Sequence, residues 1–329
     1  MVARVLVAGH WERPGPGSAG RALALVGEGL VDACPGTHVD TVPFGPGEDF
    51  EESLLAATTH SLAPVVVGVE EETTHRAGRE VLAAWGAGLT PVVEGGHNID
   101  VDAGLGFLEE LSGLEVARDA TLAGSARVAL EAARGVLGGR DLIAAASTAR
   151  PLLGLSSVVA TGIDLGPRAL QDRALTAALA RFFAGVGTAR PALALAGGPA
   201  HRDPSRLPGS GAAGGAAAVV AALGGRIVPT GTLLARTWDL DARCAACDLV
   251  VVLEPILHSP HLADALLDSV TASAALHALP VVAVGRESSL SAHEAAEWGL
   301  HGVITTGGGE EGLRRAGVRI ARTWLGVHR

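Results

Sequence analysis

The sequence predicts an α/β protein built on parallel β-sheets. Short runs of Val, Leu, Ile and Ala alternate along the chain with Ala-rich stretches of helical length. The runs are continuous rather than alternating in polarity, which is typical of strands buried on both faces of a parallel sheet. Hydrophobic residues make up 48% of the 329 residues and aromatic residues only 3%. We therefore expect a core of small aliphatic side chains between helices and strands.

These patterns place the elements as follows. The expected strands are 5–8, 39–42, 64–69, 91–94, 141–146, 192–196, 248–253, 280–284 and 302–305. The expected helices are 20–33, 123–137, 169–183, 212–223, 262–276 and 310–325. Residues 197–215 are dense in Gly, Pro, Ser and charge, and their composition fits a linker, a lid or a ligand-binding loop.

The basic residues exclude several kinds of chemistry. All 25 are arginine, and the chain contains no lysine. A P-loop lysine, a Schiff-base lysine and a lysine general base are therefore ruled out, whereas arginine can still bind phosphate or carboxylate groups. The net charge of −10 without a basic cluster argues against binding to nucleic acid.

The sequence predicts a cytoplasmic protein that does not contact membranes. Residues 1–7 form a short strand-like run rather than a signal peptide, and no stretch approaches the ~18 apolar residues of a membrane span. Three cysteines, Cys34, Cys244 and Cys247, do not make a disulfide framework. Cys244 and Cys247 have the spacing of a redox or metal-binding pair, but they precede a strand instead of opening a helix, which favours two small buried thiols.

Two segments carry candidate functional residues. Ser210 to Gly215 is glycine-rich and opens an Ala-rich helix, so it suits either a close approach to an anion or tight helix packing. Glu254 directly follows the strand 248–253 and is itself followed by His258 and His261. Because ligands of doubly wound sheets bind beyond the carboxyl ends of strands, these side chains are candidates for magnesium binding, for base catalysis or for simple solvation.

Four stretches resemble motifs of the type I glycerate kinase family. Pro208-Gly-Ser-Gly-Ala-Ala-Gly-Gly-Ala216 is similar to the family's P-G-A-G-A-A-G-G-L. The strand from Asp248 to His258, D-L-V-V-V-L-E-P-I-L-H, is in register with D-L-V-I-T-G-E-G-R-I-D. Arg150-Pro-Leu-Leu-Gly154 resembles N-P-L-x-G, and Val42-Pro-Phe44 with Gly47-Glu48 resembles P-M-A-D-G-G-E-G. The matches follow the family's order over nearly the whole chain.

The resemblance implies a fold and an activity. Residues 1–60 and 240–329 would form a flavodoxin-like, doubly wound α/β domain, and residues 61–239 a second α/β domain inserted into it. The implied reaction is phosphorylation of a small organic acid such as glycerate, with ATP and Mg²⁺ as cofactors. The oligomeric state and the hydroxyl that is phosphorylated are left open.

The resemblance also assigns roles to individual residues. Glu254 would hold or position magnesium, His258 would act as the base, and Arg13 lies close to the place of a family lysine. Arg150 would bind the substrate carboxylate, and Glu48 belongs to the same expected site. Phosphate would face the glycine-rich stretch, through Ser210, Gly211, Gly214 and Gly215.

Several family motifs are changed in this chain, which leads to an alternative hypothesis. The family's D-S-F-K-G is here His10-Trp-Glu-Arg-Pro14, and within G-E-G-R-I-D only the glutamate is kept, as Glu254. The family's G-G-S-A-T-N-D-G-G loop has no counterpart. Since the loss of one charge-stabilising group typically costs ~10²–10³ in rate, the alternative is a catalytically inactive relative that binds a small ligand or has a regulatory role.

Overall fold

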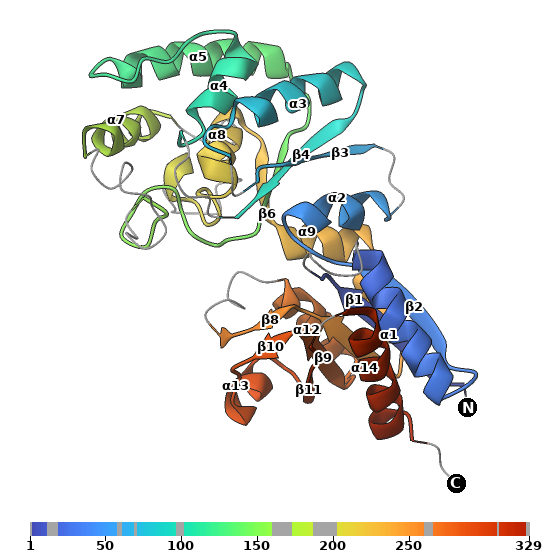
Figure 1. Ribbon diagram of the computed structural model, residues 1–329. Helices are drawn as coiled ribbons and strands as arrows, with labels where there is room; N and C mark the ends of the chain where they lie inside the picture. Colours follow the sequence, from blue (N-terminus) through green and yellow to red (C-terminus); the bar gives the residue numbers. More distant parts are fainter. Residues whose placement is uncertain are drawn as a thin grey trace, which may run out of the picture. The chain divides into compact units, whose positions relative to one another are not determined.

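A computed structural model describes residues 2–11, 19–57, 61–68, 71–96, 102–159, 173–186, 203–259, 266–307 and 309–326. The expected strand 192–196 and the candidates Arg13 and His261 lie outside these residues. The contacts divide the chain into two compact units (Figure 1). Unit 1 comprises Met1–Thr59 and Gly231–Arg329, and unit 2 comprises His60–Thr230.

Unit 1 contains a parallel five-stranded sheet. Its strands are β1 (Arg4–Gly9), β2 (His38–Pro43), β7 (Leu249–Leu253), β9 (Val281–Gly285) and β11 (Gly302–Thr305), in the order β11-β9-β7-β1-β2. The chain passes from β1 to the edge strand β2 and later builds β7, β9 and β11 on the other side of β1. This order is that of a flavodoxin-like, doubly wound sheet, and the predicted α/β fold class is confirmed.

Helices and one short strand pair complete unit 1. The helices are α1 (Ala19–Ala33), α2 (Glu48–Leu55), α9 (Thr230–Thr237), α10 (Leu240–Ala245), α12 (Leu267–Leu276), α13 (Ala292–Glu297) and α14 (Gly309–Trp324). The two-residue strands β8 (Ile256–Leu257) and β10 (Glu287–Ser288) pair with each other.

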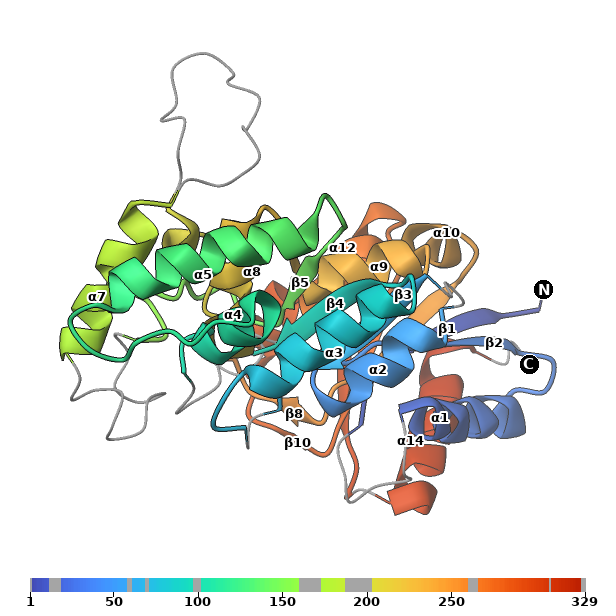
Figure 2. The same cartoon turned by 90° about the horizontal axis from the view of Figure 1, so that it is seen from above.

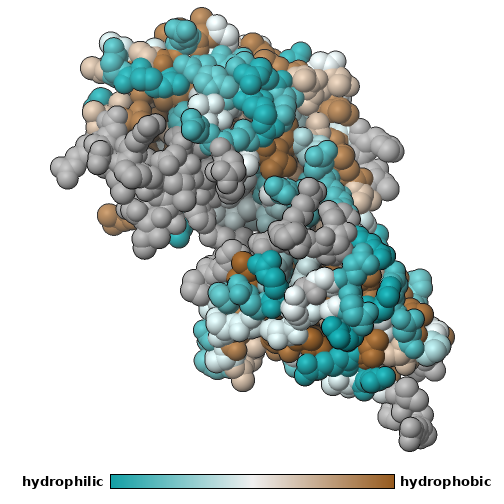
Figure 3. All heavy atoms as spheres, in the orientation of Figure 1, coloured by the Kyte–Doolittle hydropathy of each residue, from teal (hydrophilic) through white to brown (hydrophobic). Residues whose placement is uncertain are grey.

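Helices α1 and α14 pack side by side against the sheet (Figure 1). A Cβ atom at Gly29 would lie 2.0 Å from the Arg314 carbonyl oxygen, and one at Gly317 would lie 2.1 Å from that of Val26. The two helices therefore approach so closely that only glycine fits at their crossing. The space-filling view shows hydrophilic side chains in the region of α14, a helix rich in Glu and Arg (Figure 3).

Unit 2 contains a second, four-stranded parallel sheet. Its strands are β3 (Leu62–Val66), β4 (Thr90–Gly95), β5 (Ile143–Ala146) and β6 (Arg226–Pro229), in chain order across the sheet. The helices are α3 (His75–Gly86), α4 (Leu105–Ser112), α5 (Leu122–Leu137), α7 (Arg173–Ala184) and α8 (Ala216–Leu223), with the short 3₁₀ helices η1 (Pro204–Arg206) and η2 (Ala213–Gly215). Figure 2 shows α3 and α5 lying along the sheet. Every residue of α8 is buried.

The differences from the expected elements have local causes. Helix α8 starts at Ala216 rather than at 212, because Gly214 and Gly215 have positive φ angles of 63° and 88°, outside the helical region. Strand β6 was not expected: it has four residues, two of them Arg226 and Pro229, and lacks the apolar run used to find strands. Unit 1 resumes at Gly231, nine residues before the expected position 240. None of the described helices is long and apolar enough to span a membrane.

A charged cluster at the carboxyl edge of the sheet in unit 1

The candidate site lies where the strand order of the five-stranded sheet reverses. β1 pairs with β2 on one side and with β7 on the other, so the carboxyl ends of β1 and β7 flank the topological switch point. Ligands of doubly wound sheets bind at this place. His10 directly follows β1 and Glu254 directly follows β7, while Asp49 lies in the first turn of α2, beyond the end of β2.

These three side chains form one buried cluster. His10 Nδ1 lies 3.2 Å from Asp49 Oδ2, and His10 Nε2 lies 3.3 Å from Glu254 Oε2. The side chains of His10, Asp49 and Glu254 are 11%, 19% and 5% exposed. An ionised carboxylate can only accept a hydrogen bond, so both ring nitrogens are placed to donate, as only the imidazolium form can.

The electrostatic environment favours the charged form of His10. Burial by itself lowers the pKa of this imidazole, but the charge of Glu254 and the hydrogen bonds to Asp49 and Glu254 raise the pKa to about 10. His10 is therefore a cation at neutral pH, held between two anions.

Two glycines allow the cluster to form. A Cβ atom at Gly9 would lie 2.1 Å from the carbonyl oxygen of Leu253, so Gly9 lets the end of β1 approach the end of β7. A Cβ atom at Gly45 would lie 2.5 Å from Cβ of His10 and 2.7 Å from Cβ of Asp49. The absence of a side chain at Gly45 thus lets His10 and Asp49 meet.

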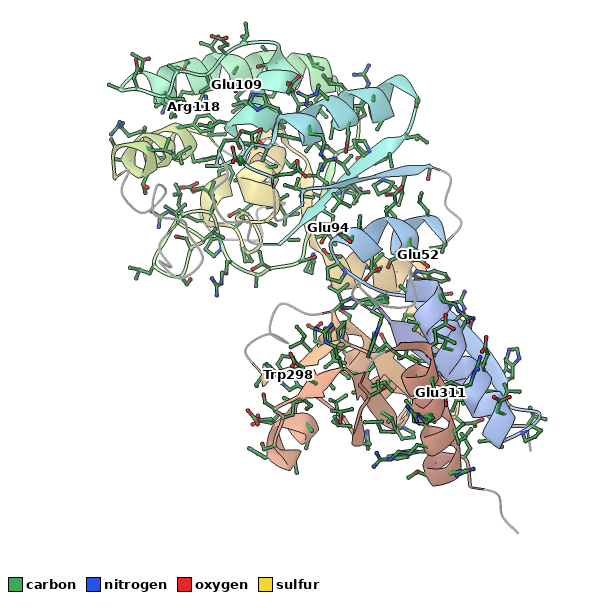
Figure 4. All side chains as sticks on the ribbon, in the orientation of Figure 1. Glu52, Glu94, Glu109, Arg118, Trp298 and Glu311 are labelled. Carbon is green, nitrogen blue, oxygen red and sulfur yellow. The ribbon has the colours of Figure 1, made fainter. Side chains whose placement is uncertain are left out.

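The N-terminus of α1, at the same edge, is already bonded to a carboxylate. The backbone N–H groups of Ala19 and Gly20 donate to Glu52 of α2, over 3.1 Å and 2.8 Å (Figure 4). A helix N-terminus following the first strand is a common phosphate site in such folds. Here the side chain of Glu52 takes the two N–H groups that an anion would use.

Unit 2 carries a different polar cluster at the carboxyl edge of its own sheet. Glu94, at the end of β4, is completely buried and accepts a hydrogen bond from the Ser147 hydroxyl (Figure 4). Ser147 lies 2.9 Å from the Thr230 hydroxyl, which follows β6. Three neighbouring strand ends thus contribute to this network of hydroxyl groups and one carboxylate.

The glycine-rich stretch is bonded internally in unit 2. Gly209 and Gly211 donate to the carbonyls of Ala149 and Arg150, and the Ser210 hydroxyl donates to the Ser205 carbonyl. Along this stretch, the backbone N–H groups that donate to backbone carbonyls are those of Gly209, Ser210, Gly211, Ala212, Ala213 and Gly215. These bonds give Ser210, Gly211 and Gly215 a structural role, and the positive φ angles of Gly214 and Gly215 set the start of α8. Their binding to phosphate stays a prediction.

The structure places the other predicted site residues as follows. Glu48 is the first residue of α2 and precedes Asp49. His258 is half-buried beyond β8, and within the described residues no hydrogen bond joins it to Glu254. Arg150 lies in unit 2, where its backbone bonds to Thr148 and Gly211. The roles of these residues stay predictions.

His10 and Asp49 were missed by the sequence analysis. The available signal was their position in the sequence: His10 occupies the first place of the segment compared with D-S-F-K-G, and Asp49 directly follows Glu48.

Cys244 and Cys247 have thiol pKa values raised to about 12 and about 11, chiefly by burial, and both are free cysteines. Such protonated thiols are unreactive. Cys244 is buried as expected, whereas Cys247 is only partly buried.

Comparison with known proteins identifies the family. The model of the glycerate kinase family matches residues 69–325, and the chain therefore belongs to this family. A solved structure titled "putative glycerate kinase 2 from Salmonella typhimurium LT2" superposes with a TM-score of 0.70 at 18% identity, covering 98% of both chains. That likeness extends the shared fold over the whole chain. No curated protein matches the sequence.

Proposed function

We propose that this member of the glycerate kinase family binds a small hydroxy acid such as glycerate at the carboxyl edge of the five-stranded sheet without transferring phosphate to it. The observation that carries the proposal is the placement of His10 between Asp49 and Glu254. Glu254 is the one residue of the family motif G-E-G-R-I-D that this chain keeps. Its carboxylate hydrogen-bonds to His10 of the same chain. Binding of a small acid follows from the family.

Magnesium and ATP, which the family resemblance implies, fit this edge poorly. Magnesium is usually held by one or two carboxylates together with substrate phosphates, and both carboxylates here already accept hydrogen bonds from His10. Within the described residues, no three His, Cys, Asp or Glu side chains are grouped as metal ligands. The N–H groups of Ala19 and Gly20, at the start of α1, donate to Glu52. No step is therefore assigned to a metal.

The ligand carboxylate needs a cation at the same edge, and Arg286 is the candidate in unit 1. Arg286 directly follows β9, the strand next to β7, and is exposed. A guanidinium can hold a carboxylate through two parallel hydrogen bonds. The expected role of Arg150, in unit 2, in binding a substrate carboxylate stays a prediction.

A coupled assay of ADP release with ATP, magnesium and D-glycerate tests the absence of transfer. We expect the wild-type protein to show no turnover above that of the Glu254→Gln variant. Binding is measured separately, by isothermal titration of D-glycerate into the wild-type protein and into Arg286→Ala. Arg322→Ala, in the last turn of α14, is the matched control. We expect Arg286→Ala to lose about 2 kcal/mol of binding free energy, the size of a hydrogen bond to a charged group. Arg322→Ala should bind D-glycerate as the wild-type protein does.

A second candidate function is the kinase reaction itself, which is favoured by the retention of Glu254 at the switch point. In that reaction the substrate hydroxyl oxygen forms a bond to the γ-phosphorus of ATP. The bond from this phosphorus to its bridging oxygen breaks, with the electron pair leaving on ADP, and His258 takes the hydroxyl proton. Turnover that disappears in Glu254→Gln would establish this reaction and overturn the proposed loss of transfer.

A further inference from the structure

We propose that the ring of His10 occupies the place of a divalent metal ion between Asp49 and Glu254, so that this pair of carboxylates excludes metal as long as His10 is present. The inference rests on the proposed function only for the location of the ligand site. It concerns metal binding by the chain alone, without nucleotide or acid.

The first argument is the position of the ring. Asp49 and Glu254 come from different elements, α2 and the end of β7, and His10 bonds to one with each ring nitrogen. A single ring is thus held between two carboxylates, in the position that a metal ion often takes. The carboxylates supply oxygen ligands, which Mg²⁺ and Mn²⁺ prefer.

The second argument is charge and burial. The ring of His10 stands between the two carboxylates and hydrogen-bonds to one of them with each nitrogen. Without it, two carboxylates that are 19% and 5% exposed would face each other with a charge of −2. Burying like charges without a counterion is strongly unfavourable, so removal of the imidazole leaves an anionic hollow that a divalent cation would fill.

A second histidine, His75, lies in similar surroundings and provides a control. In unit 2, His75 Nε2 lies 3.1 Å from Glu109, and its Nδ1 lies 4.0 Å from Asp102. These carboxylates have other partners: Glu109 binds Arg118 (both labelled in Figure 4), and Asp102 accepts hydrogen bonds from Thr74 and from the start of α4. Removal of His75 should therefore create no metal site, which makes it a matched control.

The experiment is a titration of Mn²⁺ into the full-length protein, with free Mn²⁺ measured by electron paramagnetic resonance. The variants are His10→Ala, His10→Gln, Glu254→Gln, His75→Ala and the double variant His10→Ala/Glu254→Gln. We expect wild type and His75→Ala to show only weak binding. His10→Ala should bind about one Mn²⁺ per chain at least about tenfold more tightly, as expected when a competing cation is removed from an oxygen-ligand site. The double variant should lose this gain.

Two results would overturn the proposal. One is wild-type protein that binds Mn²⁺ as tightly as His10→Ala and loses that binding in Glu254→Gln. The other is folded His10→Ala or His10→Gln, verified by circular dichroism, that gains no Mn²⁺ binding. His10→Gln keeps a polar side chain in the hollow, so it remains informative if His10→Ala does not fold. Neither result depends on phosphate transfer, so this proposal and the proposed function can fail separately.

Discussion

Glu254 and Glu94 are two buried glutamates in the same kind of place with different partners. Each stands at the carboxyl end of a strand in a parallel sheet, Glu254 in unit 1 and Glu94 in unit 2, and they are 4% and 0% exposed. Glu254 bonds to the imidazole of His10, whereas Glu94 bonds to the hydroxyl of Ser147. The comparison teaches that a buried carboxylate at a sheet edge does not by itself define a catalytic or metal site. Its partners decide how much charge is left for a ligand.

The largest expected effect is on the pH dependence of stability through His10. The pKa of His10 is about 10 in the folded protein, compared with 6.5 for an unperturbed histidine. The contribution of protonated His10 to the free energy of unfolding is therefore complete below pH 6.5, and it is lost as the pH rises from 6.5 through 10. The slope is about 1.4 kcal/mol per pH unit between these values, or about 4 kcal/mol from pH 7 to 10.

Urea unfolding at a series of pH values measures this slope in wild type and in His10→Gln. The difference between the two proteins isolates His10 from the thiols that also titrate in this range. The chain has no lysine and no tyrosine, whose side chains would otherwise titrate in the same pH range. Parallel pH profiles for the two proteins would contradict the assignment of the charge to His10.

Glu94→Ala tests the other member of the comparison. The substitution removes the acceptor of the Ser147 hydroxyl and leaves a cavity in a fully buried position. We expect a loss of about 3 kcal/mol in the free energy of unfolding, measured by chemical denaturation. Glu131→Ala, at a side chain that is 69% exposed, should change it by less than about 0.5 kcal/mol. Equal effects of the two substitutions would show that the Glu94 network contributes nothing.

Gly45→Ala sharpens the comparison by pushing apart His10 and Asp49. The new Cβ atom would lie 2.5 Å from Cβ of His10, so we expect a loss of about 1–3 kcal/mol in stability. The matched control is Gly124→Ala within α5, where a Cβ atom meets nothing within 4 Å. That substitution should stabilise the helix by about 0.5–1 kcal/mol. A neutral Gly45→Ala would contradict the close approach of His10 and Asp49.

His75→Ala has the smallest expected effect. Its side chain is 35% exposed, and Glu109 keeps Arg118 as a partner. An exposed ion pair of this kind contributes less than about 1 kcal/mol, so the melting temperature should barely change. A loss as large as that caused by Glu94→Ala would mean that the helix α4 region depends on His75 far more than its contacts indicate.

Much of the fold was predictable because buried parallel strands have a strong sequence signal. The runs at 5–8, 248–253 and 280–284 all lie within one or two residues of observed strands, since both faces of these strands are covered and their residues are uniformly apolar. Strand β6 was missed because its two end residues, Arg226 and Pro229, are exposed and polar or helix-breaking rather than apolar. Only two residues of the strand are left to give an apolar signal. The start of α8 depends on positive φ angles at two glycines, which composition does not reveal.

The site was predictable only in part. Glu254 was found because it follows a strong strand, and position at a strand end is local information. Its partner His10 was missed because it lies 244 residues away in sequence, and Asp49, which bonds to the other nitrogen of His10, lies 205 residues from Glu254. The three residues come together only when β1, β2 and β7 assemble. The glycine-rich stretch was open to two interpretations, and its hydrogen bonds support the packing role.

The central claim is that His10 is a permanent imidazolium between two carboxylates at neutral pH. Nuclear magnetic resonance of the full-length protein with ¹⁵N-labelled histidine, assigned by comparison with His10→Gln, reads the protonation of both ring nitrogens directly. We predict that Nδ1 and Nε2 of His10 are both protonated at pH 7.5 and lose a proton only near pH 10. A neutral ring at pH 7.5, with one nitrogen unprotonated, would contradict the account.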